Sequence, residues 1–166
     1  MNCSVLQNIS YGMYALGVVT PDGRPSACIV NACIQVTGNP ALIAVSVNHD
    51  NFSCECIKAN GIFSLSILSE DTAAFTIGSL GFKSGRDNDK LSKLNFHAET
   101  GGLPVIDDNI CGFMTAKVVS QAETYSHTVF IAEVTDCSEK IELKPMTYSY
   151  YHTVIKGKAP EKAPHA

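Results

Sequence analysis

Short apolar segments separated by turn residues follow one another along this chain. In residues 63–67 the apolar side chains of Phe63, Leu65 and Ile67 alternate with serines, which is typical of a half-buried strand. The other apolar segments are equally short and rich in β-branched or aromatic residues, which also predicts strands. We expect these further strands over residues 14–20, 26–36, 41–48, 111–119, 128–134 and 146–155.

Helix signals are fewer and mark short segments. Residues that commonly cap helices stand at Ser4, at Asp50 or Asn51, and at Ser69. Asn60-Gly61 would end the second helix, because glycine adopts the left-handed backbone that often closes a helix. We expect helices over residues 5–11, from residue 50 or 51 to 59, and over 70–77, a short helical turn after residue 87, and irregular chain over 101–104.

Turns connect the predicted strands directly. Pro21-Asp22-Gly23-Arg24 would join the first two strands as a hairpin, and Gly38-Asn39-Pro40 forms the next turn. Strands and helices do not alternate regularly, so a doubly wound parallel sheet is disfavoured. We expect a mainly β fold, an antiparallel Greek-key barrel with a few short peripheral helices.

Composition narrows the class of protein. The chain has 166 residues, which predicts one domain over residues 1–155, followed by a linker-like tail over 156–166. Its net charge of −4 argues against nucleic acid as a main partner. No apolar run reaches the roughly 18–20 residues of a membrane span, and the first residues show no secretory signal.

The cysteines are numerous for a chain of this length. There are seven, an odd number, without a C-x-x-C motif or zinc-like spacing. We therefore expect no bound metal and no structural disulfide, but buried free thiols in a reducing cytoplasm.

Residues 78–91, GSLGFKSGRDNDKL, carry the most suggestive chemistry. They are too polar for a strand and too rich in glycine for a helix. Lys83, Ser84 and Arg86 place two cations and a hydroxyl within four residues, and Gly85 would let the backbone turn and expose amide donors. Such a loop suits a phosphate. On its own, however, it is better explained as a solvated loop. Rossmann, P-loop and G-x-S-x-G nucleophile motifs are absent from the sequence.

Several short motifs occur in a specific order over nearly the whole chain. They are Tyr11-Gly12 with Tyr14, Asn31, Gln35-Val36-Thr37 before Pro40, Val47-Asn48, Asn51 with Ser53, Gly81-Phe82-Lys83-Ser84-Gly85-Arg86-Asp87 with Lys90, His127 before Phe130, Glu133-Val134, Thr147-Tyr148 with Tyr150-Tyr151, and Ala159-Pro160 with Ala163-Pro164. In this order they resemble the flavin reductase-like family. This family comprises FMN-binding split barrels and includes flavoredoxins and the flavin domain of high-molecular-weight rubredoxins. Two positions depart from it: the family often has lysine at His49 and threonine at Ser53.

The resemblance implies a split barrel that binds FMN at the interface of a homodimer. Ser53 would meet the phosphate at a helix start, together with Lys83, Ser84, Arg86 and Lys90, with Arg86 contributing more than Ser53. Residues 31–37, on a strand edge, would offer backbone donors to the flavin ring. His127 would line the open face of the ring or simply be an exposed residue at a strand start. The implied cofactor-binding residues are Asn31, Ala32, Cys33, Ile34, Gln35, Val36, Thr37, Asn48, His49, Asn51, Ser53, Phe82, Lys83, Ser84, Gly85, Arg86 and Lys90, of which Asn48 and Asn51 fit turn and cap roles equally well.

The family implies one of two functions. In the first, the protein is an oxidoreductase that passes electrons from NAD(P)H through FMN to free flavin, to a separate rubredoxin or to a similar acceptor. In the second, it is an FMN electron carrier of the flavoredoxin kind that binds no nicotinamide. A domain that has lost its cofactor is disfavoured, because the Lys-Ser-Gly-Arg motif is intact.

Overall fold

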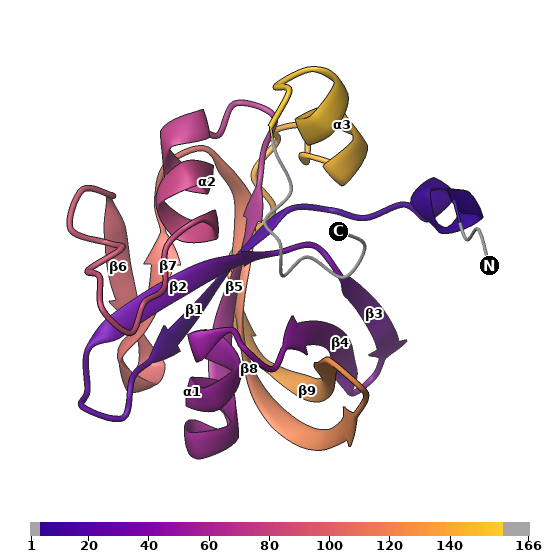
Figure 1. Ribbon diagram of the computed structural model, residues 1–166. Helices are drawn as coiled ribbons and strands as arrows, with labels where there is room; N and C mark the ends of the chain where they lie inside the picture. Colours follow the sequence, from indigo (N-terminus) through magenta and orange to yellow (C-terminus); the bar gives the residue numbers. More distant parts are fainter. Residues whose placement is uncertain (1–3, 158–166) are drawn as a thin grey trace.

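The computed structural model describes residues 4–157, and its central element is one antiparallel sheet (Figure 1). The sheet has seven strands in the spatial order β2-β1-β5-β8-β9-β4-β3. Their bounds are β1 Tyr14–Val19, β2 Pro25–Val30, β3 Cys33–Gly38, β4 Ala41–Asn48, β5 Ile62–Leu68, β8 Ile110–Glu123 and β9 His127–Cys137. A separate ribbon pairs β6, Phe96–Glu99, with β7, Leu103–Ile106.

The connection between β2 and β3 determines the shape of the sheet. These strands stand at opposite ends of the strand order, yet only Asn31 and Ala32 separate them in the chain. The sheet must therefore curl until its two edges approach each other. The result is a barrel with an open seam between β2 and β3, and Asn31 and Ala32 lie where the seam begins.

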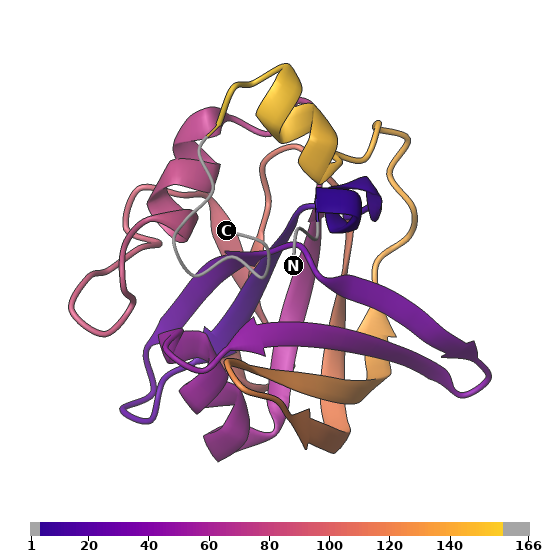
Figure 2. The ribbon, with the colours of Figure 1, turned by 45° about the vertical axis from the view of Figure 1, so that its right-hand side comes forward.

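Helix α1, Phe52–Asn60, closes one end of the barrel. It contacts β1, β2 and β4, and its buried residues Cys54, Cys56 and Ile57 join the core that fills the barrel. Two more helices, α2 Ala74–Gly81 and α3 Tyr148–Thr153, cover a second core next to the β6–β7 ribbon (Figure 2). Short 3₁₀ turns span η1 Ser4–Asn8 and η2 Thr100–Gly102.

Two predicted helices differ from the observed ones. The helix predicted over residues 70–77 starts too early, because α2 begins only at Ala74. Ser69 instead donates its hydroxyl to the Asn109 carbonyl and accepts from the Asp71 amide, which forms a turn. The same helix continues through residues 78–81, which we expected to be too rich in glycine for a helix. The helix predicted over residues 5–11 is instead a short 3₁₀ turn, Ser4–Asn8.

The predicted strand over residues 146–155 is wrong, because this segment contains α3. Its tyrosines and β-branched residues suggest a strand, but Thr147 caps a helix by accepting from the Tyr150 amide at 3.0 Å. The ring of Tyr148 packs edge-on against Tyr11, so tertiary contact also overrides the local propensity.

Other boundaries differ less. The strand expected over residues 26–36 is two strands, interrupted at Asn31 and Ala32. Residues 103–106, which were expected to be partly irregular, form β7, and β6 was not foreseen. Strands β8 and β9 are longer than predicted, whereas β4 has the predicted bounds. Most of the predicted tail, residues 158–166, lies outside the described residues.

Candidate functional site

The chain enters α1 at the barrel end through a well-ordered polar turn. Asn48 Oδ1 accepts from the Asp50 amide at 2.9 Å, and Asn51 Oδ1 accepts from the Ser53 amide at 3.0 Å. Asn51 is the N-cap of α1, so both asparagines have the turn and cap roles that we considered for them. The turn presents the positive end of the helix dipole next to the buried Ser53.

Gly85 brings the glycine-rich loop into contact with this turn. A β-carbon on Gly85 would overlap the Ser26 hydroxyl and would stand 3.6 Å from both Lys90 Cδ and Phe52 Cδ1. The backbone at Gly85 is outside the left-handed region, so close approach, not turn geometry, requires glycine here. The loop is thus closely packed on β2 and α1, and Lys90 is brought next to the residue that precedes Ser53.

Lys90 is the most unusual charged residue of the loop. It is only 8% exposed, and desolvation by burial lowers the pKa of its ammonium group. Within residues 4–157, its ammonium group makes no hydrogen bond or ion pair, and neither does the hydroxyl of Ser53. A buried cation is normally paired, because removing it from water is costly. An anion bound at the Lys90 ammonium, near the Phe52-Ser53 turn, would supply the missing partner.

The other polar residues of the loop are more exposed. Arg86 Nη2 donates to Glu55 Oε2 at 2.6 Å, and its guanidinium lies 4.6 Å from the centre of the Phe52 ring. Ser84 Oγ accepts from the Arg86 amide, which shapes the loop. Phe82 and Lys83 are exposed at the surface.

The predicted ring-binding segment divides into two parts. The Ala32 carbonyl accepts from the Ser46 amide at 2.9 Å, so Asn31, Ala32 and Cys33 lie beside the end of β4 that leads into α1. The remaining residues run away from α1 along the exposed edge strand. Their side chains bond within the hairpin: Gln35 donates to the Thr37 carbonyl and Thr37 to the Pro40 carbonyl. Residues of this second part are Ile34, Gln35, Val36 and Thr37.

His127 lies beside Asn48, because β9 pairs with β4 at this register. Its Nδ1 is 2.8 Å from the Ser126 hydroxyl, whereas its Nε2 is buried and has no partner among the described residues. Burial, with a smaller contribution from His49, lowers the pKa of His127. The ring is therefore neutral near pH 7 and offers one unsatisfied nitrogen.

His49, which we expected to contact the cofactor, points toward a carboxylate. Its Nε2 is 3.0 Å from Glu123, which also binds Lys58 Nζ at 2.9 Å and accepts from the Thr128 hydroxyl. Hydrogen bonding to Lys58 is the main reason that the pKa of Glu123 is lowered. Glu123, Lys58 and Glu55 were missed by sequence reasoning, since their partners are distant in the chain and no motif marks them.

A family model and several known proteins match this chain over nearly its whole length. A family model described as "Flavin reductase like domain" matches residues 6–157. The chain is 35% identical over 164 residues to the high molecular weight rubredoxin of Moorella thermoacetica, covering 99% of this chain and 71% of that protein. It is 31% identical over 165 residues to the ferric-chelate reductase (NAD(P)H) of Archaeoglobus fulgidus, covering 98% of this chain and 96% of that protein. The chain belongs to the flavin reductase-like family.

Solved structures agree with this assignment. The flavin reductase PheA2 in its native state superimposes with a TM-score of 0.72 at 26% identity, covering 89% of this chain and 93% of that one. The flavoredoxin of Desulfovibrio vulgaris (Miyazaki F) has a TM-score of 0.70 at 23% identity, with coverage of 82% and 76%, which supports the fold. The predicted family, the split-barrel fold and the class of flavin-linked oxidoreductase are confirmed.

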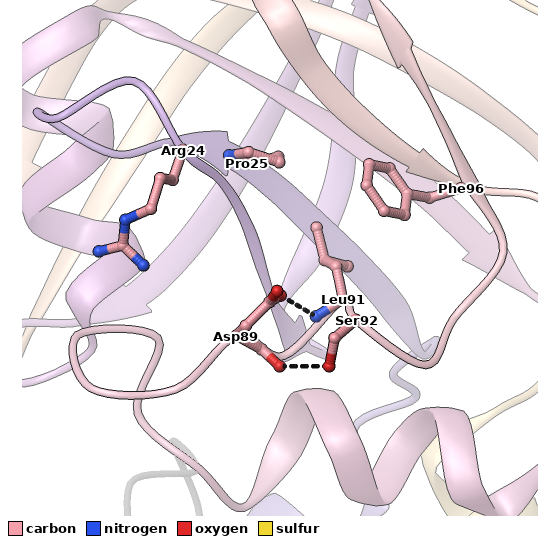
Figure 3. A pocket seen from close by; sticks show the side chains of 6 residues that line it. All are labelled: Arg24, Pro25, Asp89, Leu91, Ser92 and Phe96. Carbon is pink, nitrogen blue, oxygen red and sulfur yellow. Dashed lines mark hydrogen bonds between the residues drawn. The ribbon is translucent and has the colours of Figure 1, made fainter.

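A separate pocket lies between the start of β2 and residues 89–96 (Figure 3). Its volume is about 210 Å³. Its polar groups already have partners within the chain: Arg24 pairs with Asp22, and the Asp89 carboxylate accepts from the Leu91 amide. This pocket therefore lacks the unsatisfied groups of the Lys90 region. It is lined by Arg24, Pro25, Asp89, Leu91, Ser92 and Phe96.

The cysteines of this flavin reductase-like chain take no part in a metal cluster within residues 4–157. Six of them are described and all six are free. Burial raises the pKa of the Cys33 and Cys56 thiols to about 11, which keeps both protonated at neutral pH. Among the described helices, none has the length and apolar character needed to cross a membrane.

Proposed function

We propose that the chain binds FMN along the barrel seam and passes electrons from NAD(P)H to an acceptor. The carrying observation is Lys90, a residue only 8% exposed whose ammonium has no partner within residues 4–157 and whose Cδ lies near Phe52, beside Ser53 at the start of α1. Such a group fits the doubly charged phosphate of FMN and does not fit a neutral ligand. The related ferric-chelate reductase (NAD(P)H) supports the nicotinamide donor, and the related high molecular weight rubredoxin supports a rubredoxin-type acceptor.

The phosphate would be held mainly by side chains. Lys90 contributes charge in a desolvated position, and Ser53 contributes a hydroxyl at the positive end of the α1 dipole. Arg86 adds a second cation at the exposed rim, with Ser84 and Lys83 beside it in the loop. The Ser53 amide is already used by Asn51, so the backbone contributes less than the sequence suggested. The pairing of Arg86 with Glu55 also lowers the share that we assign to Arg86.

The flavin ring would lie where the seam meets His127. The segment from Asn31 to Cys33 and the outer edge of β3, which pairs with no other described strand, would supply backbone groups there, and His127 Nε2 would supply a buried neutral nitrogen. Bound FMN would supply the hydride-accepting and electron-passing chemistry. The protein would orient the two nucleotides and exclude water, and His127 would form a hydrogen bond without adding charge.

We also propose that the protein is a cytoplasmic homodimer. Apolar side chains are exposed on η1 and on the edge strand β3, where Ile34 is 67% and Val5 69% exposed. The β3–β4 hairpin projects from the barrel (Figure 2), and a second copy would cover these surfaces and give the flavin cleft another wall. Sedimentation of the loaded protein at micromolar concentration tests the dimer. A monomer that retains tightly bound FMN would contradict it.

Titration with two flavins tests the function. FMN and riboflavin share the ring but differ in the phosphate, so the protein should bind FMN far more tightly. Stopped-flow reduction of the FMN-loaded protein by NADH and by NADPH then distinguishes an enzyme from an electron carrier. Failure to bind FMN would refute the site, whereas binding without reduction by either nicotinamide would leave the flavoredoxin-like alternative.

A further inference from the structure

One carboxylate lies at the mouth of the proposed phosphate site. Glu55 is in the first turn of α1, two residues after Ser53, and its Oε2 accepts from Arg86 Nη2 at 2.6 Å. Both side chains are about half exposed, at 52% and 55%. A pair this exposed adds little to the stability of the fold, so its main effect would be on a ligand bound beside it.

Glu55 lies where its negative charge would weaken the binding of an anion. A negative charge in the first turn already occupies the positive end of the α1 dipole, where the phosphate would bind. Its partner Arg86 comes from the loop that holds Lys90 and stacks on Phe52, next to Ser53. In the structure, one carboxylate oxygen is thus bound to a guanidinium donor that a phosphate oxygen would also bind.

We propose that Glu55 is an internal competitor of the flavin phosphate for Arg86, and that it sets the affinity for FMN. This inference rests on the proposed FMN site and assigns a role to a residue outside the family motif. When FMN binds, Arg86 exchanges the Glu55 carboxylate for a phosphate oxygen, while Lys90 and Ser53 remain as the fixed part of the site. FMN therefore binds more weakly, and dissociates faster, than it would if only Lys90, Ser53 and Arg86 acted on its phosphate.

A substitution that removes the charge of Glu55 tests the competition. Glu55→Gln should bind FMN about two- to fivefold more tightly than the original protein, as expected for loss of an exposed ion pair. Most of the change should be in the dissociation rate, measured by stopped-flow displacement with excess riboflavin. Riboflavin affinity should not change, because riboflavin makes no phosphate contact. Glu142→Gln is the matched control, since it removes the same charge from an exposed pair with Lys140.

A double-mutant cycle with Arg86→Gln tests the mechanism. If Glu55 acts mainly through Arg86, most of the gain from Glu55→Gln should disappear once Arg86 is replaced, leaving only the smaller direct effect of its charge at the start of α1. An equal gain in both backgrounds would show a general charge effect and would overturn the competition. Weaker FMN binding by Glu55→Gln would also overturn it, by showing that Glu55 orients Arg86 for the phosphate. If the unmodified protein bound no FMN, the proposed function would fail as well, which separates the two failures.

Discussion

Gly85 lies so close to Ser26 that a β-carbon on residue 85 would overlap the Ser26 hydroxyl. Gly85→Ala should therefore force the loop away from β2 and displace Lys90, because Lys90 Cδ is 3.6 Å from the same position. We expect the free energy of unfolding to fall by about 1–3 kcal/mol, as in other overpacked sites. FMN affinity should fall with it. Urea unfolding and flavin titration measure the two effects.

Two further variants test whether the overlap with Ser26 causes the losses of stability and FMN affinity. Adding Ser26→Ala to Gly85→Ala removes the overlapping hydroxyl and should restore most of both losses. Gly78→Ala, in α2, meets no atom within 4 Å and should stabilise the protein by about 0.5–1 kcal/mol. If Gly85→Ala behaved like Gly78→Ala, the close approach would not matter to the site.

Lys90→Met should separate stability from binding. The substitution keeps the length of the side chain but removes a buried charge that has no partner in the described part of the chain. FMN affinity should fall about ten- to a hundredfold, since a charge-assisted bond contributes roughly 1.5–3 kcal/mol. The flavin-free protein should unfold at the same or a higher urea concentration. Equal losses for FMN and riboflavin would exclude the phosphate contact.

Much of the barrel was predictable because its signals are local. The alternation in residues 63–67 and the cap at Asn51 depend on neighbouring residues, and the structure has a strand and a helix there. These local signals were misleading where a contact with a distant residue determines the structure. Ser69 has the chemistry of a helix cap, but the Asn109 carbonyl binds its hydroxyl from another part of the chain.

The same distinction applies to the site. Lys83, Ser84 and Arg86 are prominent in the sequence because they lie close together, yet Lys90 is the one that is buried and has no partner within residues 4–157. Burial depends on packing of the loop against β2 and α1, which spacing along the chain does not show. The carboxylates of Glu55 and Glu123 are similar cases, since their cationic partners are brought to them by the fold.

His127→Asn should affect reduction of the flavin more than binding of FMN. The lowered pKa of His127 keeps its ring neutral at pH 7, and protonation on acidification would put a charge on a buried nitrogen. The rate of FMN reduction by NADH should fall as pH decreases below 6.5, the ordinary value for histidine. His127→Asn should lower the rate at pH 7 about tenfold, as for loss of one hydrogen bond, and abolish this pH dependence. A variant with an unchanged pH profile would assign His127 a purely structural role.

His97 provides a test of electrostatics away from the proposed flavin site. On the β6–β7 ribbon, its Nδ1 contacts Asp107 at 2.5 Å and its Nε2 contacts Glu99 at 3.0 Å. The hydrogen bond with Asp107 is the main reason that the pKa of His97 is raised from 6.5. A histidine with a raised pKa in the folded state stabilises the protein below its unfolded value, and this stabilisation is lost as pH rises through the folded value.

His97→Gln should therefore reduce the free energy of unfolding more at pH 5.5 than at pH 8.5. The difference should be modest and should shrink in high salt, because the His97 side chain is 42% exposed and solvent screens its pairs. Urea unfolding at both pH values measures it. Asp107→Asn should produce the larger part of the same difference and Glu99→Gln the smaller part, since Asp107 has the greater effect on the pKa of His97. A greater loss at pH 8.5 would mean that His97 acts through packing on Phe113, which its ring meets edge-on at 5.4 Å, and not through its charge.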